Sequence, residues 1–459
     1  MLLSIPFPPL PSPPSWFPGH MNRFTKQLPA LLSRTDIVLE LRDSRLPLTS
    51  INHNFEGAIR KWRAERGKVT YSSQPLRGAA VESSPVSGYG GMTCERIIVL
   101  NKRDLVPEWG MEPFRRAMAS RFPEQIIHFA SCNRREDIKS LSALLVNIAK
   151  RNPHATETNV LVVGMPNVGK STLLNSLRNF GIAGRTPKAL QTSSQPGHTR
   201  ALSNRLKLSE DPLVYSFDTP GVMLPFLGRG DEGAERGVKL ALIGESSSSN
   251  CLTELHANLI TAGIKEGLYD VEALVAYLLY RLNVLHPVSP AYLKVLPPGT
   301  APTPSVSIFL EQLARRLGML LRGGECDTTR AAKWFVEWWR REGGLFSAAA
   351  PHALPSAVAI TGSQGQQPQP GRGSVVRRGW GFDLEWSVEQ GDFVPDVAVS
   401  ILEHRMGECI DEFVERTQEY DRQGGTVSQT QEKKRTWEEK LAQRAAKSKA
   451  KFIARKKGF

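Results

Sequence analysis

The sequence is poor in cysteine and contains no apolar run long enough to cross a bilayer. Its five cysteines are scattered through 459 residues without any CxxC pair. This argues against a zinc ribbon or a disulfide scaffold and favours a reducing compartment. A membrane-spanning helix needs roughly 18 consecutive apolar residues, and no stretch supplies them. The sequence therefore predicts no transmembrane segment.

Basic residues are also missing from the start of the sequence. No lysine or arginine precedes Arg23, and prolines interrupt residues 1–20. A mitochondrial presequence is usually an arginine-rich amphipathic helix, which prolines prevent. The first residues also lack the charged region and unbroken apolar stretch of a secretory signal, so they give no clear address.

Positive charge is concentrated at the other end of the chain. The 59 lysines and arginines against 45 acidic residues give a net charge of +14. Residues 433–459 alone contribute +9, from eleven basic and two acidic side chains. A basic tail favours a polyanionic partner, most commonly nucleic acid, and a solvated tail that aids solubility is the alternative.

The apolar pattern predicts an α/β domain followed by helices. Short apolar strands are expected within 36–43, 96–104, 159–164 and 212–221, and they alternate with helical stretches. This alternation is typical of a largely parallel sheet. Asp270 is a suitable N-cap for a helix with apolar residues at 271, 274, 275, 278 and 282 on one face.

Later segments give coarser predictions. Three tryptophans, Trp334, Trp338 and Trp339, have helical spacing, which favours a core cluster over a base-stacking platform. Residues 394–422 indicate one or two helices. Stretches rich in Gly, Ser, Pro or Gln are interpreted as inserted loops, at 66–92, 246–250 and 346–378.

The strongest motif is Gly-Met-Pro-Asn-Val-Gly-Lys-Ser at 164–171, which fits G-x-x-x-x-G-K-[ST] between a strand and a helix. Backbone N–H groups of such a loop wrap phosphates, Lys170 reaches the β- and γ-phosphates, and Ser171 offers its hydroxyl to Mg²⁺. The loop predicts a nucleotide site with contacts from Asn167, Val168, Gly169, Lys170, Ser171 and Thr172. A chance glycine turn would not explain the lysine.

A second motif, Asp218-Thr219-Pro220-Gly221, ends the next convincing apolar strand. An aspartate at this place contacts Mg²⁺ indirectly, and the amide of Gly221 senses the γ-phosphate. Alone, this tetrapeptide is only a turn. Its position 47 residues after Ser171 indicates a nucleotide-sensing switch.

A third motif, Asn101-Lys102-Arg103-Asp104, predicts which base is bound. The Asp104 carboxylate would accept hydrogen bonds from N1–H and the exocyclic amine of guanine, while Lys102 packs over the ring. Adenine offers no such pair of donors on that edge, so the motif favours GTP over ATP. Ser131 and Cys132, which follow a strand-like stretch at 126–129, are candidates for a further backbone contact to the base.

The order of the motifs is unusual. Ordinary small GTPases begin with the phosphate loop and end with the base motif, whereas here residues 101–104 precede 164–171 and 218–221. The same sheet forms if the old termini are joined and a new break follows the switch, because domain termini often lie close together. The sequence therefore predicts a circular permutation. In this order the switch leads directly into the C-terminal region. Our hypothesis is that GTP hydrolysis moves that region through the switch.

These motifs resemble the circularly permuted ribosome biogenesis GTPase A family, and within it the mitochondrial ribosome-associated GTPase 1 branch. The resemblance covers most of residues 16–285. It is carried by Trp16-Phe17-Pro18-Gly19-His20-Met21, Leu41-Arg42-Asp43-Ser44-Arg45-Leu46-Pro47, the three motifs above, Pro196-Gly197-His198-Thr199, Lys239-Leu240-Ala241, Ile264-Lys265-Glu266 and Asp270-Val271-Glu272-Ala273-Leu274.

The resemblance implies binding of GTP and Mg²⁺ and a role in late assembly of the large ribosomal subunit, which stimulates a weak intrinsic hydrolysis. Thr199 matches the switch threonine that closes on Mg²⁺. Val222 stands where Ras-like proteins place a water-orienting glutamine. The family's substitute is a histidine matching His20, and an exposed loop histidine is the alternative.

Other family matches also have two readings. Asn167 matches an asparagine that related GTPases use to hold K⁺ near the phosphates, and stabilisation of the loop is the alternative. His198 is a competitor of His20 for the catalytic role, and a solvent-facing switch residue is the alternative. Arg42, Asp43 and Arg45 are expected to form structural ion pairs or turns.

The expected fold class is thus α/β, a circularly permuted P-loop GTPase domain followed by a helical domain and a basic tail. The predicted divisions are a Pro-rich segment 1–14, a GTPase domain 15–246 with the insertion 66–92, a helical domain 259–425 with the insertion 346–378, and an RNA-contacting tail 426–459. The serine-rich insertion at 246–250 splits a stretch that the family keeps continuous, and a retained intron is the alternative explanation.

The expected partners are GTP or GDP and the large ribosomal subunit with its rRNA. The expected location is the mitochondrial matrix side, with peripheral contact to the inner membrane. One alternative is a related nuclear or cytosolic GTPase of subunit maturation, with the tail as a localisation signal. Another is a non-catalytic, GTP-dependent RNA-binding scaffold in which His20 has no chemical role.

Overall fold

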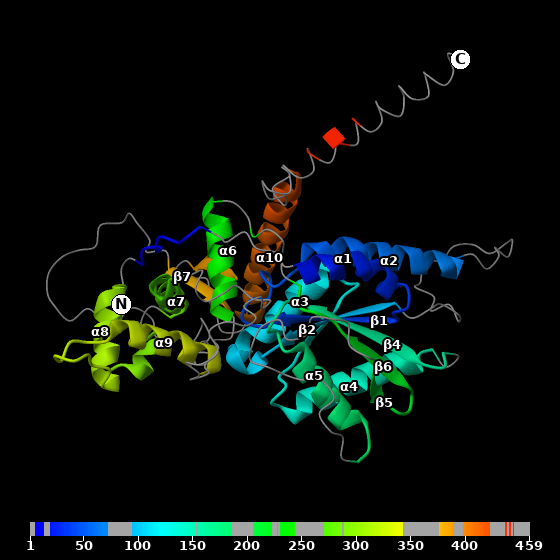
Figure 1. Cartoon of the computed structure of the whole chain (residues 1–459), viewed down its shortest axis with the longest axis horizontal. Helices are drawn as coiled ribbons and strands as arrows, with labels where there is room; N and C mark the ends of the chain where they lie inside the picture. Colours follow the sequence, from blue (N-terminus) through cyan, green and yellow to red (C-terminus); the bar gives the residue numbers. More distant parts are fainter. Residues whose placement is uncertain are drawn as a thin grey trace.

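A computed structural model describes most of the chain (Figure 1). The described residues are 5–12, 19–71, 94–152, 155–184, 205–222, 227, 230–243, 270–286, 289–342, 376–388 and 398–422, with residues 437, 440, 441 and 444. The predicted loop at 246–250 and nearly all of the basic tail lie outside these residues. None of the described helices is long and apolar enough to cross a membrane.

A six-stranded sheet forms the centre of the N-terminal half, in the order β3-β2-β1-β4-β6-β5. The strands are β1 (Ile37–Asp43), β2 (Glu95–Asn101), β3 (Ile126–Phe129), β4 (Thr158–Gly164), β5 (Leu206–Ser209) and β6 (Val214–Asp218). All neighbouring pairs are parallel except β5 with β6. The prediction of a largely parallel sheet is confirmed. Strand β2 ends at Asn101, and a 3-10 turn at Arg103–Leu105 follows it, so the polar residues at the end of the predicted range 96–104 lie outside the strand.

Helices cover both faces of the sheet, which explains why its central strands β1, β2 and β4 are buried along almost their whole length. In Figure 1, α1 (Gly19–Leu32) and α2 (His53–Tyr71) lie above the sheet, and α4 (Arg135–Lys150) and α5 (Lys170–Gly181) lie below it. Helix α2 extends to Tyr71, so the predicted insertion at 66–92 begins inside a helix rather than in a loop.

The next described elements are helical, as predicted. They are α6 (Gly230–Ile243), α7 (Val271–Leu285), a 3-10 turn at Ala291–Val295, α8 (Val306–Leu317) and α9 (Thr328–Glu342). Asp270 caps α7 by accepting a hydrogen bond from the Glu272 amide. Trp339 is fully buried and Trp338 almost so, and the latter stacks on Phe335. The tryptophans therefore belong to the core.

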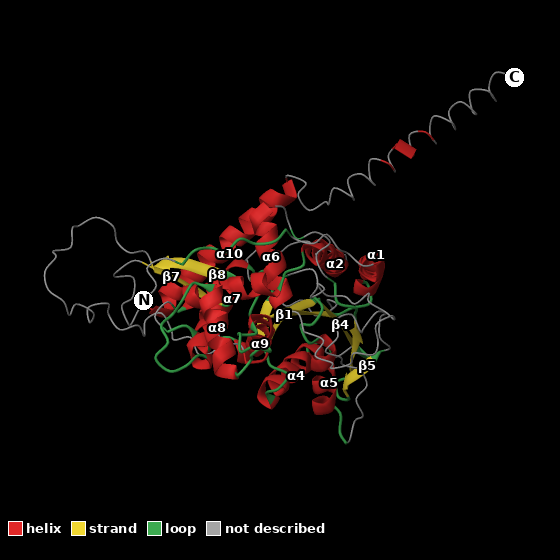
Figure 2. Ribbon diagram, turned by 60° about the vertical axis from the view of Figure 1, so that its left-hand side comes forward, coloured by secondary structure: helices red, strands yellow, loops and turns green. Residues whose placement is uncertain are grey.

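A β-hairpin in the C-terminal region was not predicted. It consists of β7 (Val376–Trp380) and β8 (Leu384–Val388). The prediction that 346–378 is one inserted loop is therefore wrong for residues 376–378, which form a strand. Helix α10 (Ala398–Arg422) is a single helix. Figure 2 shows it beside β8, on the hairpin's side of the molecule.

The hairpin and α10 share a hydrophobic cluster with the six-stranded sheet. Trp380, Leu384 and Met406 pack in one buried group with Ile98 and Leu100 of β2 and with α3 (Met111–Arg121). An ion pair between Arg121 and Asp411 joins α3 to α10. The C-terminal elements therefore pack directly on the N-terminal half.

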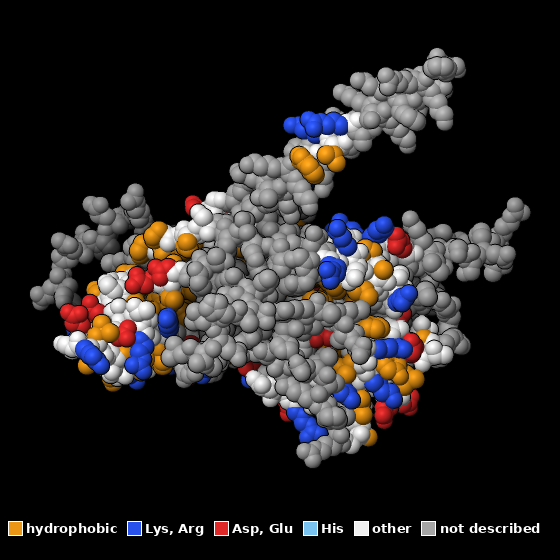
Figure 3. Space-filling model, in the orientation of Figure 1, with side chains coloured by type: hydrophobic (Ala, Val, Ile, Leu, Met, Phe, Trp, Pro, Cys, Tyr) orange, Lys and Arg blue, Asp and Glu red, His pale blue; other side chains and the backbone are white. Residues whose placement is uncertain are grey.

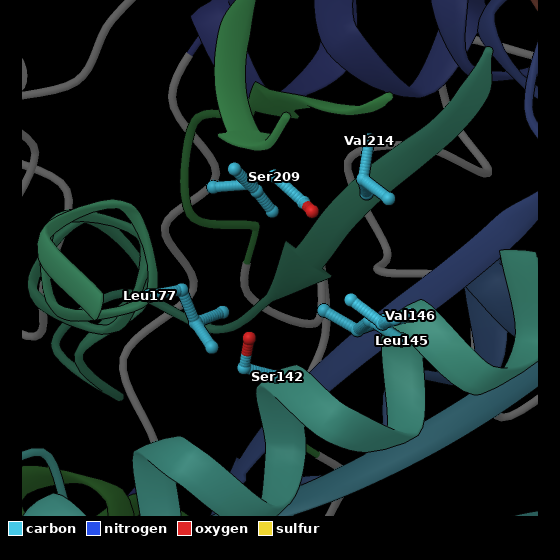
Figure 4. A pocket seen from close by; sticks show the side chains of 7 residues that line it. Ser142, Leu145, Val146, Leu177, Ser209 and Val214 are labelled. Carbon is cyan, nitrogen blue, oxygen red and sulfur yellow. The ribbon is translucent and has the colours of Figure 1, made fainter. Parts of the chain in front are cut away.

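The described residues also show a charged surface and a small pocket. Figure 3 shows acidic and basic side chains mixed, with lysines and arginines gathered over α1 and α2. A small pocket between α4, α5 and the strands β5 and β6 (Figure 4) is lined by Ser142, Leu145, Val146, Leu177, Leu208, Ser209 and Val214. Its lining is mostly aliphatic and contains no charged side chain.

Candidate functional site

The sheet has a reversal point between β1 and β4. The chain builds β1, β2 and β3 toward one edge, then returns to β4 beside β1 and continues toward the other edge. Open α/β sheets bind ligands outside the carboxyl ends of the strands at such a reversal. Asn101, Gly164 and Asp218 end β2, β4 and β6 at this edge. The three predicted motifs therefore meet at one place, in permuted order.

The phosphate-loop backbone has the conformations that its glycines permit. Gly169 precedes α5 with φ 91°, and Asn167 has a left-handed φ of 61°. A Cβ on Gly169 would lie 2.5 Å from Nδ2 of Asn101, and the positive φ would strain any other residue there. The amino end of α5 thus faces the edge where the motifs meet, which is the arrangement that binds phosphate.

Lys170 is buried in the loop that it follows. Its Nζ donates to the carbonyl oxygens of Met165 at 2.7 Å and Gly164 at 3.3 Å. Burial lowers the pKa of Lys170 to about 8, and the nearby Asp218 opposes this shift. A phosphate group would supply the negative charge that these neutral carbonyls lack.

Ser171 and Asp218 form a hydroxyl–carboxylate pair beside the loop. Ser171 Oγ donates to Asp218 Oδ2 at 2.6 Å. Burial raises the pKa of Asp218, while Lys170 and the hydrogen bond from Ser171 oppose the rise. Oxygen donors of these two kinds suit Mg²⁺. The residues present therefore fit the metal that the motifs imply.

The segment after β6 packs against the phosphate loop through its backbone. A Cβ on Gly221 would lie 2.6 Å from Cα of Pro166. Val222 N donates to Gly164 O at 3.2 Å, and the Val222 carbonyl accepts from Nδ2 of Asn52 at 3.1 Å. Val222 is fully buried, and its aliphatic side chain cannot polarise water. Asn52 was not singled out from the sequence.

Two side chains of the base motif are attached to the phosphate loop. Asn101 Nδ2 donates to Val168 O at 2.7 Å, and Lys102 Nζ donates to Asn167 O at 3.0 Å. Lys102 also forms an ion pair with Asp43 at 3.5 Å. The structure thus brings together the base motif and the phosphate loop, through contacts whose partners are 67 and 65 positions apart.

A carboxylate on α4 joins the two loops predicted to contact the base. Arg103 donates to both carboxylate oxygens of Asp137, at 2.6 and 2.8 Å, and the Ser131 amide donates to Asp137 Oδ2 at 2.9 Å. The hydrogen bond that Arg103 donates to Asp137 raises the pKa of Arg103. Asp104, beside Arg103, remains partly exposed. No sequence pattern indicated Asp137.

Cys132 contacts the base motif with its side chain. Its Sγ lies 3.6 Å from Oδ1 of Asn101 and donates to it. Burial raises the pKa of the Cys132 thiol to about 11, so it remains a neutral donor. The thiol therefore helps to orient the amide of Asn101.

Several predicted residues are only partly placed or not placed. Thr172 is exposed in the first turn of α5. His20 belongs to the backbone of α1, and its side chain lies outside the description. Thr199 and His198 also lie outside the described residues. The expected structural ion pairs are confirmed, since buried Arg42 pairs with Glu40 and buried Arg45 with Asp43, each at 2.7 Å.

Comparisons with known proteins agree with this geometry. A family model described as "50S ribosome-binding GTPase" matches residues 159–275. The protein "Mitochondrial GTPase 1" of Schizosaccharomyces pombe is 31% identical over 332 residues, which are 72% of this chain and 87% of the relative. "Mitochondrial ribosome-associated GTPase 1" of Xenopus tropicalis is 31% identical over 236 residues, which are 50% of this chain and 63% of the relative.

Among solved structures, the chain is similar to GNP-bound YlqF from T. maritima, with 19% identity and a TM-score of 0.39. The match covers 70% of this chain and 94% of that one. The predictions of a P-loop GTPase fold with permuted motifs and of GTP hydrolysis are confirmed. The mitochondrial location is confirmed by relatives from fungi and animals. The chain belongs to the mitochondrial GTPase 1 family.

Proposed function

We propose that this GTPase couples GTP hydrolysis to late assembly of the large ribosomal subunit in mitochondria. The observation that carries the proposal is the meeting of the base motif, phosphate loop and switch at one edge of the sheet. The names of the Xenopus relative and of the matching family model support the ribosomal role. The basic tail at 433–459 suits an RNA partner.

The site residues have distinct proposed roles. Asp104 accepts hydrogen bonds from guanine, Lys102 packs over its ring, and backbone near Ser131 and Cys132 completes the base contact. The 167–172 loop holds the phosphates. Mg²⁺ would be held by Ser171 and Thr199, with Asp218 acting through water, and it would neutralise charge on the β- and γ-phosphates.

Hydrolysis proceeds by in-line attack of water on the γ-phosphate. Lys170 stabilises the charge that develops on the phosphate oxygens. The water needs an orienting group from elsewhere, because Val222 stands where a glutamine would do this. We assign that role to His20 or to ribosomal RNA. His20→Ala distinguishes them, since unchanged turnover on the subunit removes the assignment of the histidine.

Asn167 has two proposed roles that one measurement separates. The left-handed backbone at this residue and the hydrogen bond to its carbonyl favour stabilisation of the loop. The other proposed role is K⁺ binding by the side chain of Asn167. Turnover that is several-fold faster in KCl than in NaCl, and loses this difference in Asn167→Ala, would establish the cation.

The domain roles are likewise proposals. We assign catalysis to residues 15–246, subunit contact to 259–425 and RNA contact to 426–459. Deletion of 433–459 should weaken RNA binding and flatten its dependence on salt. Equal salt slopes with and without the tail would leave it a solvated segment. Peripheral contact with the inner membrane would appear as binding to vesicles that contain anionic lipid.

The decisive experiment measures GTP turnover in KCl with purified mitochondrial large subunits, and with cytosolic large subunits as the control. We expect strong stimulation by the mitochondrial particle alone. Stimulation by the cytosolic particle alone would contradict the mitochondrial substrate. GTP binding without stimulation by either particle would favour a GTP-dependent scaffold.

A further inference from the structure

The segment that connects β1 to α2 is buried although it is irregular. Every residue from Asp43 to Ser50 is buried, so its backbone N–H groups need protein partners. Leu48 N and Thr49 N both donate to Asp383 Oδ2 at 2.8 Å, and Thr49 Oγ1 donates to Asp383 Oδ1 at 2.6 Å. Residues 43–52, which we name the β1–α2 connection, therefore depend on a carboxylate more than 300 positions further along the chain.

The hairpin turn that carries Asp383 fits closely against the connection. Phe382 N donates to Arg45 O at 2.8 Å. Gly381 has φ 60°, and a Cβ there would lie 2.9 Å from the same carbonyl oxygen. Trp380 Nε1 donates to Pro107 O at 3.0 Å, which fixes the strand before the turn. The turn is thus placed by contacts on both of its sides.

Both ends of the connection reach the nucleotide site. At the first end, Asp43 pairs with Lys102 of the base motif, and Ser44 N donates to Asn101 O at 2.9 Å. At the other end, Asn52 Nδ2 donates to the Val222 carbonyl that follows the switch motif. A shift of the connection would therefore displace the base motif and the switch together.

The charge of Asp383 is balanced from a third element. Its side chain is 2% exposed, and Lys239 Nζ of α6 lies 3.6 Å from Oδ1. Helix α6 is the first described helix after the switch motif. A buried carboxylate with three hydrogen-bond donors and one ammonium neighbour is costly to disturb, because loss of one partner leaves the others unsatisfied.

We propose that Asp383 is a positioning residue for guanine-nucleotide binding, acting through the β1–α2 connection on Lys102 and on Val222. The inference rests on the roles proposed above for the base motif and the switch. Coupling between two sites is reciprocal. A partner that moves the C-terminal hairpin would therefore change nucleotide affinity, and bound nucleotide would stabilise the hairpin on the sheet.

The test compares Asp383→Asn with Glu385→Gln in the full-length protein. Glu385 lies in the same hairpin and pairs with Arg281 of α7. Thr49→Val removes only the hydroxyl bond. The measurement is the dissociation rate of methylanthraniloyl-GDP. This rate constant does not depend on the fraction of the protein that is active. Thermal unfolding without nucleotide reports the loss of stability.

We expect Asp383→Asn to speed dissociation by roughly tenfold, within the usual range of coupling between sites. Thr49→Val should speed it by about threefold, because it loses one of the three hydrogen bonds to the carboxylate. Glu385→Gln should lower the unfolding temperature while dissociation stays within about twofold. Equal rates in Asp383→Asn and Glu385→Gln would overturn the inference. If Asp383→Asn does not fold, Thr49→Val carries the test, and a wild-type rate in that variant overturns it.

An assay of the preference for GTP over xanthosine triphosphate distinguishes failure of this inference from failure of the proposed base site. If Asp104→Asn still prefers GTP over xanthosine triphosphate, the base assignment fails. If Asp104→Asn changes preference but Asp383→Asn releases nucleotide at the wild-type rate, only the positioning role fails.

Discussion

The two halves of the nucleotide edge are held together by different means. In the base half, residues 101–105 and 130–134, a backbone bond from Arg103 N to Ala130 O is reinforced by side chains, above all by the bonds of Asp137 to Arg103 and to the Ser131 amide. In the phosphate half, residues 164–171 and 218–222, backbone approaches backbone so closely that Gly164 and Gly221 have no space for a Cβ. The base half is therefore vulnerable to loss of charge, and the phosphate half to one added methyl group.

The largest effect is expected in the base half, from Asp104→Asn. The amide cannot accept from both guanine donors, so GTP affinity should fall by about a thousandfold or more, while xanthosine triphosphate becomes preferred. Competition binding with both nucleotides measures the change. Glu112→Gln, which removes an exposed carboxylate of α3, is the control. An unchanged preference would show that Asp104 does not contact the base.

Gly221→Ala should break the phosphate half. The new Cβ would meet Cα of Pro166 at 2.6 Å and its nitrogen at 2.7 Å, so the switch must move away from the loop. A displacement of about 1 Å costs roughly a hundredfold in rate, and guanine selectivity should survive. Phosphate release measures turnover. Gly57→Ala, where nothing lies within 4 Å of the new methyl group, should keep full activity; full activity of Gly221→Ala would refute the steric account.

The difference between the halves also explains what could be predicted from the sequence. The phosphate loop, the strand before it and the Asp270 cap are local patterns, and the structure has them where expected. Asp137 and Asn52 bind residues 34 and 170 positions away, and single side chains at such distances leave no periodic signal. The hairpin did have a local signal, because apolar and polar residues alternate around Gly381. The low-complexity stretch before it obscured the start of β7.

Asp137→Asn should weaken the base half without abolishing it. The variant loses the negative charge of the carboxylate, whose two oxygens both accept hydrogen bonds from Arg103. The oxygen of the new side-chain amide can still accept the hydrogen bond from the Ser131 backbone amide. We expect the KM for GTP to rise about tenfold and kcat to stay within about twofold. Steady-state kinetics measure both constants. Glu136→Gln, in the same first turn of α4 but exposed, should leave KM unchanged, and equal KM values in the two variants would refute the specific role of Asp137.

The smallest effect belongs to the phosphate half and concerns the proton on Lys170. Burial holds the pKa of Lys170 at about 8 in the folded protein, against 10.5 for an ordinary lysine. The unfolded chain therefore binds more protons between these values, and the stability of the nucleotide-free protein rises as pH increases through this range. Bound phosphate opposes the effect of burial on Lys170, because its negative charge favours the ammonium form and raises the pKa of Lys170.

Nucleotide binding should consequently take up a proton near pH 8, and GDP affinity should fall about threefold from pH 7.5 to pH 8.5. Fluorescence titration at three pH values measures this slope. Lys170→Arg is charged throughout the range and should lose the slope whatever its absolute affinity. Asp137→Asn should lower affinity and keep the slope, because it changes the base half alone. An affinity independent of pH in the wild-type protein would mean that Lys170 is already fully charged before phosphate arrives, and its carbonyl partners would then have to offset its burial.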